Sequence, residues 1–417
     1  MKEISITDEH VREVLDFTEE VVKNYPRRLV GTPSCIEAGK RIAEEFSKNC
    51  DASSVKREEF TCHPEAFLKY IRPVVIAYII SMALVWLKRP FKALIGYGLS
   101  VATFVTEFAF YKEYIDPLFP KKKGYNVYGV LEPEGEVRQQ IILCGHHDAA
   151  YVFHYMKTSP RLYPLFILAG ILPFVLGFLF SMYMTITKKF PRWMKGTITA
   201  GLSGVIPLWW FTTDEVSPGA GDNMIATAIA NEATKIFADQ KKKGKNPLKH
   251  TRIICLSVDG EESGLRGSRA FVKRHEKELK DIKTYVFCMD TLYNADKLIF
   301  FDNDLNLTVD LSHEMAQELV DIATSLGYKA KVSRMPWGGG STDAASFGQK
   351  GIEATCLLAF ELDIRNLQQD LSYHTPKDTP DKIEPLMVKQ TLTIIREYIL
   401  KKDREASNLA GSKRSAA

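Results

Sequence analysis

The sequence lacks the basic surface pattern that nucleic-acid-binding proteins carry. Its 417 residues include 55 basic and 51 acidic ones, so the net charge is only +4. No compact Lys/Arg stripe is interleaved with aromatic residues, and the dense basic run at 121–123 indicates a solvated or juxtamembrane turn. Because nucleic-acid binding depends on such a basic patch, we expect no nucleic-acid partner.

Paired cysteines are also lacking. The chain has seven cysteines, an odd number, and no C-x-x-C pair. This excludes a zinc-finger spacing and does not indicate a disulfide framework. Four cysteines lie in apolar runs typical of buried strands: Cys144, Cys255, Cys288 and Cys356. We therefore expect free cysteines packed as small hydrophobic residues, which mildly favours a reducing compartment.

The charged first 17 residues lack an apolar stretch, so we expect no signal peptide. Apolar runs do occur further along the chain, at 74–87, 93–111, 162–186 and 196–211. A membrane-spanning helix needs about 20 apolar residues, a length that only the third run meets easily. Glu107 falls inside the second run, which leaves buried core helices as the alternative. Because the four runs pair around basic tips, we expect two transmembrane hairpins, at 67–123 and 161–212.

The membrane orientation stays open on these cues. Basic residues at the hairpin tips favour tips in the cytoplasm: Lys88, Arg89, Lys92, Lys188, Lys189, Arg192 and Lys195. That orientation would require the charged sequence before the first span to be translocated without a signal peptide, and further basic residues lie near the other helix ends. We expect a multi-pass integral membrane protein in contact with the lipid bilayer, with a slight preference for a cytoplasmic catalytic domain.

Outside the hairpins, short apolar runs alternate with helical stretches. The runs lie at 125–132, 139–145, 252–258, 284–290 and 353–360. This alternation predicts an α/β fold, with a mixed, mostly parallel central sheet and helices on both faces. The polar, small-residue-rich end of the chain at 402–417 is predicted to be disordered.

Five segments with metal-ligating residue types follow these runs or fill loops. They are G-H-H-D (145–148), G-A-G-D-N (219–223), D-G-E-E-S-G (259–264), M-D-T (289–291) and Y-H-T-P-K-D-T (373–379). Each alone is weak, because such pairs of residues occur by chance in many proteins. Since strand ends gather functional groups at one edge of an α/β sheet, the five together predict a metal centre.

These residue types suit a pair of zinc ions. Two close ions need a carboxylate that bridges them, with imidazole and carboxylate ligands around each. Sharing a water between the ions lowers its pKa and gives hydroxide near neutral pH. A carboxylate that is not a ligand must take the proton and pass it to the departing amine. Adjacent glutamates suit both tasks, since one can bind metal while its neighbour faces the water.

In this order the five segments resemble the co-catalytic zinc exopeptidase family, which contains bacterial and yeast aminopeptidases, glutamate carboxypeptidase and glutaminyl cyclase. The resemblance covers about 1–66 and 124–400, and the segments at 28–33 and 341–348 also resemble family features. It implies a peptide substrate, two zinc ions per chain and five ligands: His146, Asp222, Glu262, Asp290 and His374. Asp222 would bridge the ions. His146 and Asp290 would complete the first site, and Glu262 and His374 the second.

The resemblance also assigns two residues that do not bind metal. Glu261 corresponds to the general base, and Asp148 to the carboxylate that orients the site. His147 occupies a variable position, so we expect a neighbour of the site. The sequence departs from the family at Gly221, where the motif usually carries an aspartate before the bridging residue. The hairpins are the largest departure, and the second enters between the first two ligands, so we expect the active site to open near the bilayer.

This interpretation divides the chain into a peptidase domain (1–66, 124–160 and 213–401), two inserted hairpins (67–123 and 161–212) and a tail (402–417). The expected function is a membrane-anchored zinc exopeptidase, with an aminopeptidase favoured over a carboxypeptidase. A glutaminyl-cyclase-like acyltransferase with one zinc ion and a non-catalytic membrane scaffold are the alternatives. The intact ligand set disfavours the scaffold. Residue preference, natural substrate, oligomeric state and the metal used in the cell stay open.

Overall fold

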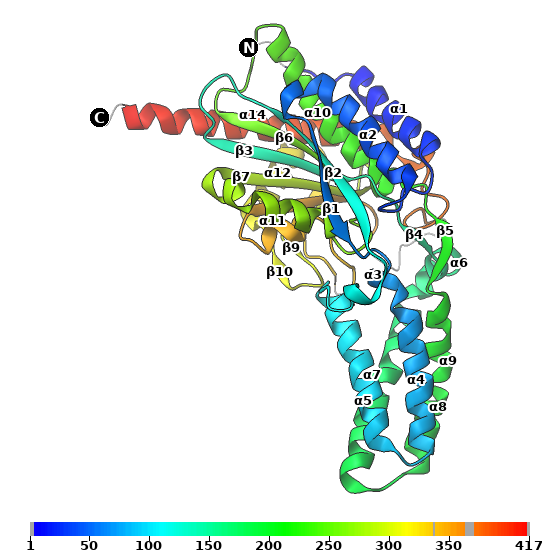
Figure 1. Ribbon diagram of the computed structural model, residues 1–417. Helices are drawn as coiled ribbons and strands as arrows, with labels where there is room; N and C mark the ends of the chain where they lie inside the picture. The colour runs from blue at the N-terminus through cyan, green and yellow to red at the C-terminus, as the bar shows by residue number, and fades with distance from the viewer. Residues whose placement is uncertain (1–3, 337, 363–370, 415–417) are drawn as a thin grey trace.

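A computed structural model describes residues 4–336, 338–362 and 371–414. Figure 1 shows two parts, a sheet covered by helices and a helical bundle that projects from one end of it. Both termini lie on the sheet part, away from the far tip of the bundle.

The central sheet has eight strands and is mostly parallel in its middle. In spatial order they are β1 (Lys56–Cys62), β2 (Lys122–Leu131), β6 (Thr251–Val258), β3 (Gln139–His146), β7 (Lys283–Leu292), β12 (Glu353–Ala359), β8 (Leu298–Phe301) and β11 (Ala330–Ser333). The neighbours from β6 to β12 run parallel, whereas β1, β2 and β6 pair antiparallel, as do β12 and β8. The strands expected from the apolar runs are confirmed.

Alternate residues of the central strands face two separate cores, as the period of a strand requires. Ile141 and Leu143 of β3 pack into one core, and Ile142 and Cys144 into the other. The first core is covered by α1 (Asp8–Asn24), α2 (Pro33–Asn49), α10 (Ile225–Lys242), α12 (His313–Ser325) and α14 (Pro385–Arg414). The second is covered by α11 (Arg266–Asp281) and α13 (Ala344–Gly348). The predicted fold class is confirmed, and all seven cysteines are buried and unpaired.

The bundle contains α4 (Ile71–Trp86), α5 (Pro90–Thr103), α7 (Tyr163–Thr187), α8 (Arg192–Ala200) and α9 (Leu202–Val205). Its interior is aromatic. The ring centroid of Tyr78 lies 5.2 Å from that of Tyr97 and 4.9 Å from that of Phe174. Small residues let the helices approach closely, since a Cβ atom added at Gly177 would lie 2.7 Å from the Tyr97 ring.

The exterior of the bundle is apolar, the reverse of a bundle that faces water. Among the described residues, all exposed large hydrophobic side chains except Leu307 and Leu386 lie within 67–123 or 161–212. Two helical stretches, Ala66–Trp86 and Pro160–Thr187, are long and apolar enough to cross a membrane.

The predicted disorder at the end of the chain is wrong as far as Arg414, because α14 continues to that residue. Its polar composition is compensated by specific contacts at the start of this stretch. Lys402 Nζ lies 2.6 Å from a carboxylate oxygen of Glu318, and the Asp403 carboxylate accepts the backbone N–H groups of His250 and Thr251, each at 2.8 Å. Long-range ion pairs and hydrogen bonds of this kind are invisible to composition.

One carboxyl group is buried in α10 without full compensation. Glu232 is 3% exposed, and its Oε1 atom has no hydrogen-bond partner in the described part of the chain. Oε2 lies 3.6 Å from Lys235 Nζ, which is itself paired with Glu13. Burial, with smaller contributions from the nearby acids Asp239 and Glu45, raises the pKa of Glu232 from 4.5 to about 8.

This shift makes the stability of the fold depend on pH. A carboxyl group whose pKa is raised on folding contributes fully below its ordinary pKa of 4.5, and the contribution is lost as the pH rises toward 8. Glu232→Gln cannot ionise, so we expect its Tm to match that of the wild type near pH 5 and to exceed it by about 2–4 °C at pH 8. Thermal unfolding in detergent across this pH range measures the effect, with the exposed Glu44→Gln as control. Equal Tm differences at both pH values would contradict the assignment.

Candidate metal centre

Neighbouring parallel strands deliver three of the expected site segments to one edge of the sheet. His146 is the last residue of β3, and β3 pairs with β7 through Cys144 and Cys288. Asp290, two residues beyond Cys288, therefore lies level with His146. On the other side of β3, Val258 ends β6 opposite His146 and leads into the loop that carries the two glutamates.

Asp222 stands in a short irregular turn, Ala220–Met224, directly before α10, and its peptide bond to Asn223 is cis. Two glycines shape this turn. Gly219 has φ +68°, and an added Cβ atom would lie 2.8 Å from Arg28 Nη2. A Cβ atom at Gly221 would lie 2.0 Å from the Tyr293 ring. The Tyr293 ring therefore explains the departure from the family motif at this position.

His374 reaches the site from a loop near the end of the chain. Its backbone carbonyl accepts the N–H of Phe153 at 3.1 Å. The Phe153 ring meets the imidazole edge-on, with centroids 4.3 Å apart, and the Tyr373 ring stacks on it at 4.0 Å. Phe153 belongs to β4 (Tyr151–Phe153), which pairs with β5 (Thr212–Val216) next to the bundle. These rings fix the imidazole where it faces Asp222.

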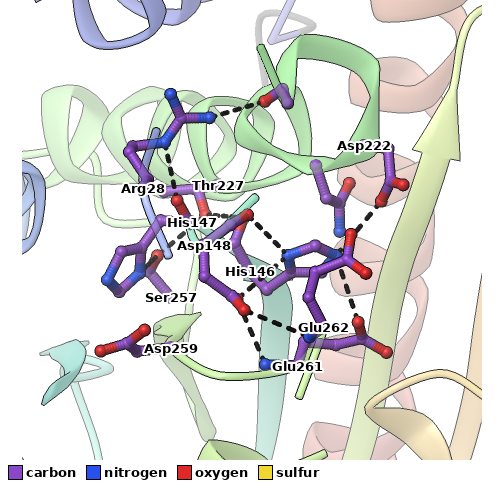
Figure 2. Close-up of polar contacts among 12 residues, drawn as sticks. Arg28, His146, His147, Asp148, Asp222, Thr227, Ser257, Asp259, Glu261 and Glu262 are labelled. Atoms are coloured by element: carbon purple, nitrogen blue, oxygen red, sulfur yellow. Dashed lines mark hydrogen bonds and ion pairs between the residues drawn. The ribbon is translucent and has the colours of Figure 1, made fainter. Parts of the chain in front are cut away.

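The carboxylate of Asp222 lies between two imidazoles. Its Oδ1 atom is 3.4 Å from His146 Nε2, and its Oδ2 atom is 3.1 Å from His374 Nε2. His374 Nε2 is also 3.3 Å from Glu262 Oε2, and His146 Nε2 is 3.8 Å from Glu261 Oε2. Figure 2 shows His146 at the centre of this group, with Asp222 on one side and Asp148 on the other. Each oxygen of one carboxylate thus faces a different histidine.

The residues present fit metal ions at this place. His146 Nε2, Asp222 Oδ2 and Glu262 Oε1 are buried, and none of them has a hydrogen-bond partner among the residues that the structure describes. Unpartnered buried polar atoms are costly, and three of them that converge on one another are explained by a shared ligand. Ligand atoms of His146, Asp222 and Glu262 all lie within 4.8 Å of one another, as a metal site requires.

Asp148 holds the glutamate loop in place without facing the shared space. Its Oδ1 atom accepts the backbone N–H of Glu261 at 3.2 Å, and its Oδ2 atom accepts that of Glu262 at 3.1 Å (Figure 2). Its Oδ1 atom also lies 3.4 Å from His146 Nδ1. One carboxylate therefore orients a histidine and both glutamates, the role that the sequence predicts for it.

Two further residues organise the loops, and sequence reasoning gave neither of them a role. Arg28 is fully buried and donates from Nε to the carbonyl of His147 at 2.8 Å and from Nη2 to that of Gly219 at 2.8 Å. Asp378 accepts the N–H groups of Gly221 at 2.7 Å and Asp222 at 3.3 Å. Both residues lie in segments noted as family-like, but only the fold shows that they tie together loops about 120 to 190 residues apart.

The electrostatics of the group separate its acids. Burial raises the pKa of Glu261 well above its ordinary value, with Asp290 and Glu262 adding to the rise and His146 opposing it. Burial also acts on Asp222, but the adjacent imidazoles of His146 and His374 outweigh it and hold the pKa of Asp222 below its usual range. Asp222 therefore stays ionised as a ligand, while Glu261 has the raised pKa that suits a proton acceptor.

His147 lies outside this group, as expected. Its Nδ1 atom is 2.8 Å from Ser257 Oγ, and burial lowers the pKa of the imidazole to about 3, so it stays neutral. Cys35 and Asp259 lie beside it. Asp259 already accepts the Cys35 thiol at 3.2 Å and the Tyr125 backbone N–H at 2.9 Å, so its two oxygens have partners, whereas His147 Nε2 is buried with none among the described residues.

The structure thus brings together the segments that the sequence selected. Direct contacts join His146, Asp222, Glu261, Glu262 and His374. The register of β7 places Asp290 beside this group, where it interacts electrostatically with Asp222 and His146. Its Oδ1 atom accepts the Thr291 hydroxyl at 2.9 Å.

Comparison with known proteins gives one family match and a shared fold. The sequence profile of Peptidase family M28 matches residues 205–399. No curated protein sequence matches the chain. The expected resemblance to an exopeptidase family is confirmed over the matched residues.

Solved structures share the fold at low sequence identity. A Zn-dependent exopeptidase from Parabacteroides distasonis is 12% identical with a TM-score of 0.54, over 94% of this chain and 97% of that one. A zinc aminopeptidase from Bacillus subtilis is 13% identical with a TM-score of 0.54, over 94% and 95%. A glutaminyl cyclase from Fimbriiglobus ruber is 13% identical with a TM-score of 0.53, over 94% of both chains. Peptidases and cyclases therefore share this fold.

The contacts of Asp148 lead to a prediction about metal affinity. Asp148→Ala removes the acceptor of two backbone N–H groups, so both glutamates and His146 lose their fixed orientation. We expect zinc affinity to fall about 10- to 100-fold, the usual effect of removing such a supporting group. Equilibrium dialysis with a zinc-selective chelator measures the affinity, and the exposed Asp281→Ala serves as control. An unchanged affinity would show that the loop holds its shape without Asp148.

Proposed function

We propose that this chain is a membrane-anchored exopeptidase with two zinc ions, and that it removes amino-terminal residues from peptides with Glu261 as general base. The observation that carries the proposal is the position of Asp222, whose two oxygens face His146 and His374 separately. A carboxylate shared in this way is the bridge that two neighbouring ions require.

The remaining groups divide between the two ions. His146 and Asp290 would hold one ion together with Asp222, and Glu262 and His374 would hold the other. Zinc bound there would polarise the scissile carbonyl and make a bound water acidic enough to lose a proton near neutral pH.

Glu261 is the group best placed to handle the proton. It lies beside the ligands, with Oε2 3.8 Å from His146 Nε2, and its raised pKa lets it accept a proton from water and then donate it to the departing amine. Asp148 holds the backbone of Glu261 and Glu262 in one loop, so that one carboxylate serves as ligand and its neighbour as base.

An acid that is not a proposed zinc ligand favours an aminopeptidase over a carboxypeptidase. The charge of Asp343 raises the pKa of Glu261, and Asp343 Oδ1 is buried with no hydrogen-bond partner among the described residues. A negative field of this kind attracts a cationic α-amine and repels a terminal carboxylate. The shared fold makes a glutaminyl-cyclase-like acyltransferase the second candidate. The presence of five ligand residues argues against it, because the cyclase alternative is expected to use one ion.

The bundle supports the membrane part of the proposal. α7 has 25 residues and is therefore about 37 Å long, enough for a hydrocarbon core of about 30 Å. Four of the five tryptophans of the chain lie at the two ends of the bundle. Trp86 and Trp193 lie at the tip, where Lys195 Nζ is 4.4 Å from the Trp86 ring centroid. Trp209 and Trp210 lie at the base, where the Arg72 guanidinium is 5.7 Å from the Trp209 ring centroid.

Tryptophan and basic residues at two levels are typical of membrane–water interfaces. We call Arg72, Trp209 and Trp210 the base belt. Between the base belt and the tip, the exterior of the bundle carries apolar side chains such as Ile80, Leu168 and Leu172, with exposed fractions of 46–59%. Water-exposed apolar area on this scale is unfavourable, and lipid contact removes it.

Peptide digestion with Glu261→Gln tests the proposed chemistry. The variant keeps the shape and the metal ligands but cannot accept a proton, so we expect kcat to fall about 10²- to 10⁴-fold with zinc content unchanged. Detergent-purified protein is incubated with a mixed peptide pool, and products are followed by mass spectrometry. We expect stepwise loss from the amino end in the wild type.

The control is Glu136→Gln, a glutamate with an 80% exposed side chain that should leave trimming unchanged. Loss of residues from the carboxyl end would reverse the polarity. Loss of ammonia from amino-terminal glutamine without trimming would establish the cyclase. If zinc-loaded protein catalyses neither reaction, the catalytic proposal is wrong.

A further inference from the structure

A cavity lies where the bundle meets the sheet domain. Arg72 and Trp209 of the base belt line it together with Thr213 of β5. Because the base belt marks a membrane–water interface in the proposed arrangement, this cavity lies at the level of the lipid headgroups.

A second cavity leads from there to the metal centre. Its lining includes Asp148 and Glu262. Leu68, Lys69 and Tyr151 line both cavities, so the two adjoin. We call the pair the interfacial groove. It runs from the base belt to a proposed zinc ligand.

We propose that the interfacial groove receives the membrane-proximal segment of peptides anchored in the lipid bilayer, and that such anchored peptides are the substrate class of this chain. The inference rests on the proposed exopeptidase function. It assigns to the groove an occupant that follows from its two ends: one end lies at the level of the headgroups, and the other reaches the group that would bind the scissile end.

The ends of the first hairpin are built into the wall of the site. The Phe67 ring lies against the glutamate loop, since a Cβ atom added at Gly264 would be 2.8 Å from it. Tyr111 packs on Phe67 with ring centroids 4.7 Å apart. Arg266, directly after the loop, is 2.8 Å from Asp116 in the returning segment of the same hairpin. The segment with Glu261 and Glu262 is therefore held between the two crossings of this hairpin.

The ends of the second hairpin approach the other side of the site. Phe153, which contacts His374, packs against Phe211 with centroids 4.8 Å apart and stacks on Tyr163 at 6.3 Å. Tyr163 is the first residue of α7, and Leu165, two residues further, is 60% exposed on the apolar exterior. One aromatic ring thus separates a proposed zinc ligand from the start of the most apolar helix.

The test uses the full chain in liposomes and peptides that share one amino-terminal sequence. Each peptide carries a carboxyl-terminal dodecyl-type lipid anchor after a spacer of two, six or twelve residues, or no anchor at all. We expect anchored peptides with spacers of six and twelve residues to be trimmed faster than the free peptide. Leu68→Trp fills the point where the cavities adjoin, so the ratio of anchored to free turnover should fall at least tenfold.

Thr213→Trp, at the outer cavity and away from the proposed ligands, repeats the test if Leu68→Trp does not fold. Ile80→Trp, on the lipid-facing exterior with 55% exposure, is the matched control and should keep the wild-type ratio. An unchanged ratio in both groove variants, or trimming only with the longest spacer, would overturn the inference while leaving the exopeptidase intact. No turnover of the free peptide by zinc-loaded protein would instead overturn the proposed function itself.

Discussion

The arrangement depends on one carboxylate that two histidines share. Asp222 faces His146 with one oxygen at 3.4 Å and His374 with the other at 3.1 Å, although these residues come from distant parts of the chain. Burial would favour a neutral carboxyl group, yet the two imidazoles keep its pKa low. A charged group in such surroundings is stable only with compensation, which the histidines provide in the protein alone and metal ions would provide in the enzyme.

Everything around Asp222 serves to hold it at this point. Asp378 accepts the N–H of Asp222 itself, and Arg28 fixes the carbonyls of the two loops on either side. Asp148 holds Glu261 and Glu262 in the same way, because its carboxylate accepts their backbone N–H groups. None of these three supporting residues needs to touch substrate. They limit the movement of the ligands, which is the condition for catalysis by groups that must stay within tenths of an ångström.

Much of this could be predicted from the sequence, because strand ends and ligand types leave a local signal. The apolar runs predict the central strands, and the five short motifs predict the residues that the structure brings together. Arg28 and Asp378 lacked a local signal, since their roles are hydrogen bonds across about 160 to 190 residues. The order of α14 beyond Lys402 was missed for the same reason, because Asp403 and Glu318 act at long range. The sequence indicated the bundle only as apolar runs. Its aromatic interior could be seen only in the structure, because the rings that meet there come from different helices.

Zinc content per chain is the most direct test of the shared carboxylate. The detergent-purified chain, dialysed against buffered zinc, is measured by elemental mass spectrometry beside Asp222→Ala and His374→Ala. The account predicts two ions in the wild type, one in His374→Ala, and loss of both in Asp222→Ala, because only Asp222 serves both sites. If Asp222→Ala kept one ion, as His374→Ala should, Asp222 would be a ligand of a single ion and the bridge would not exist.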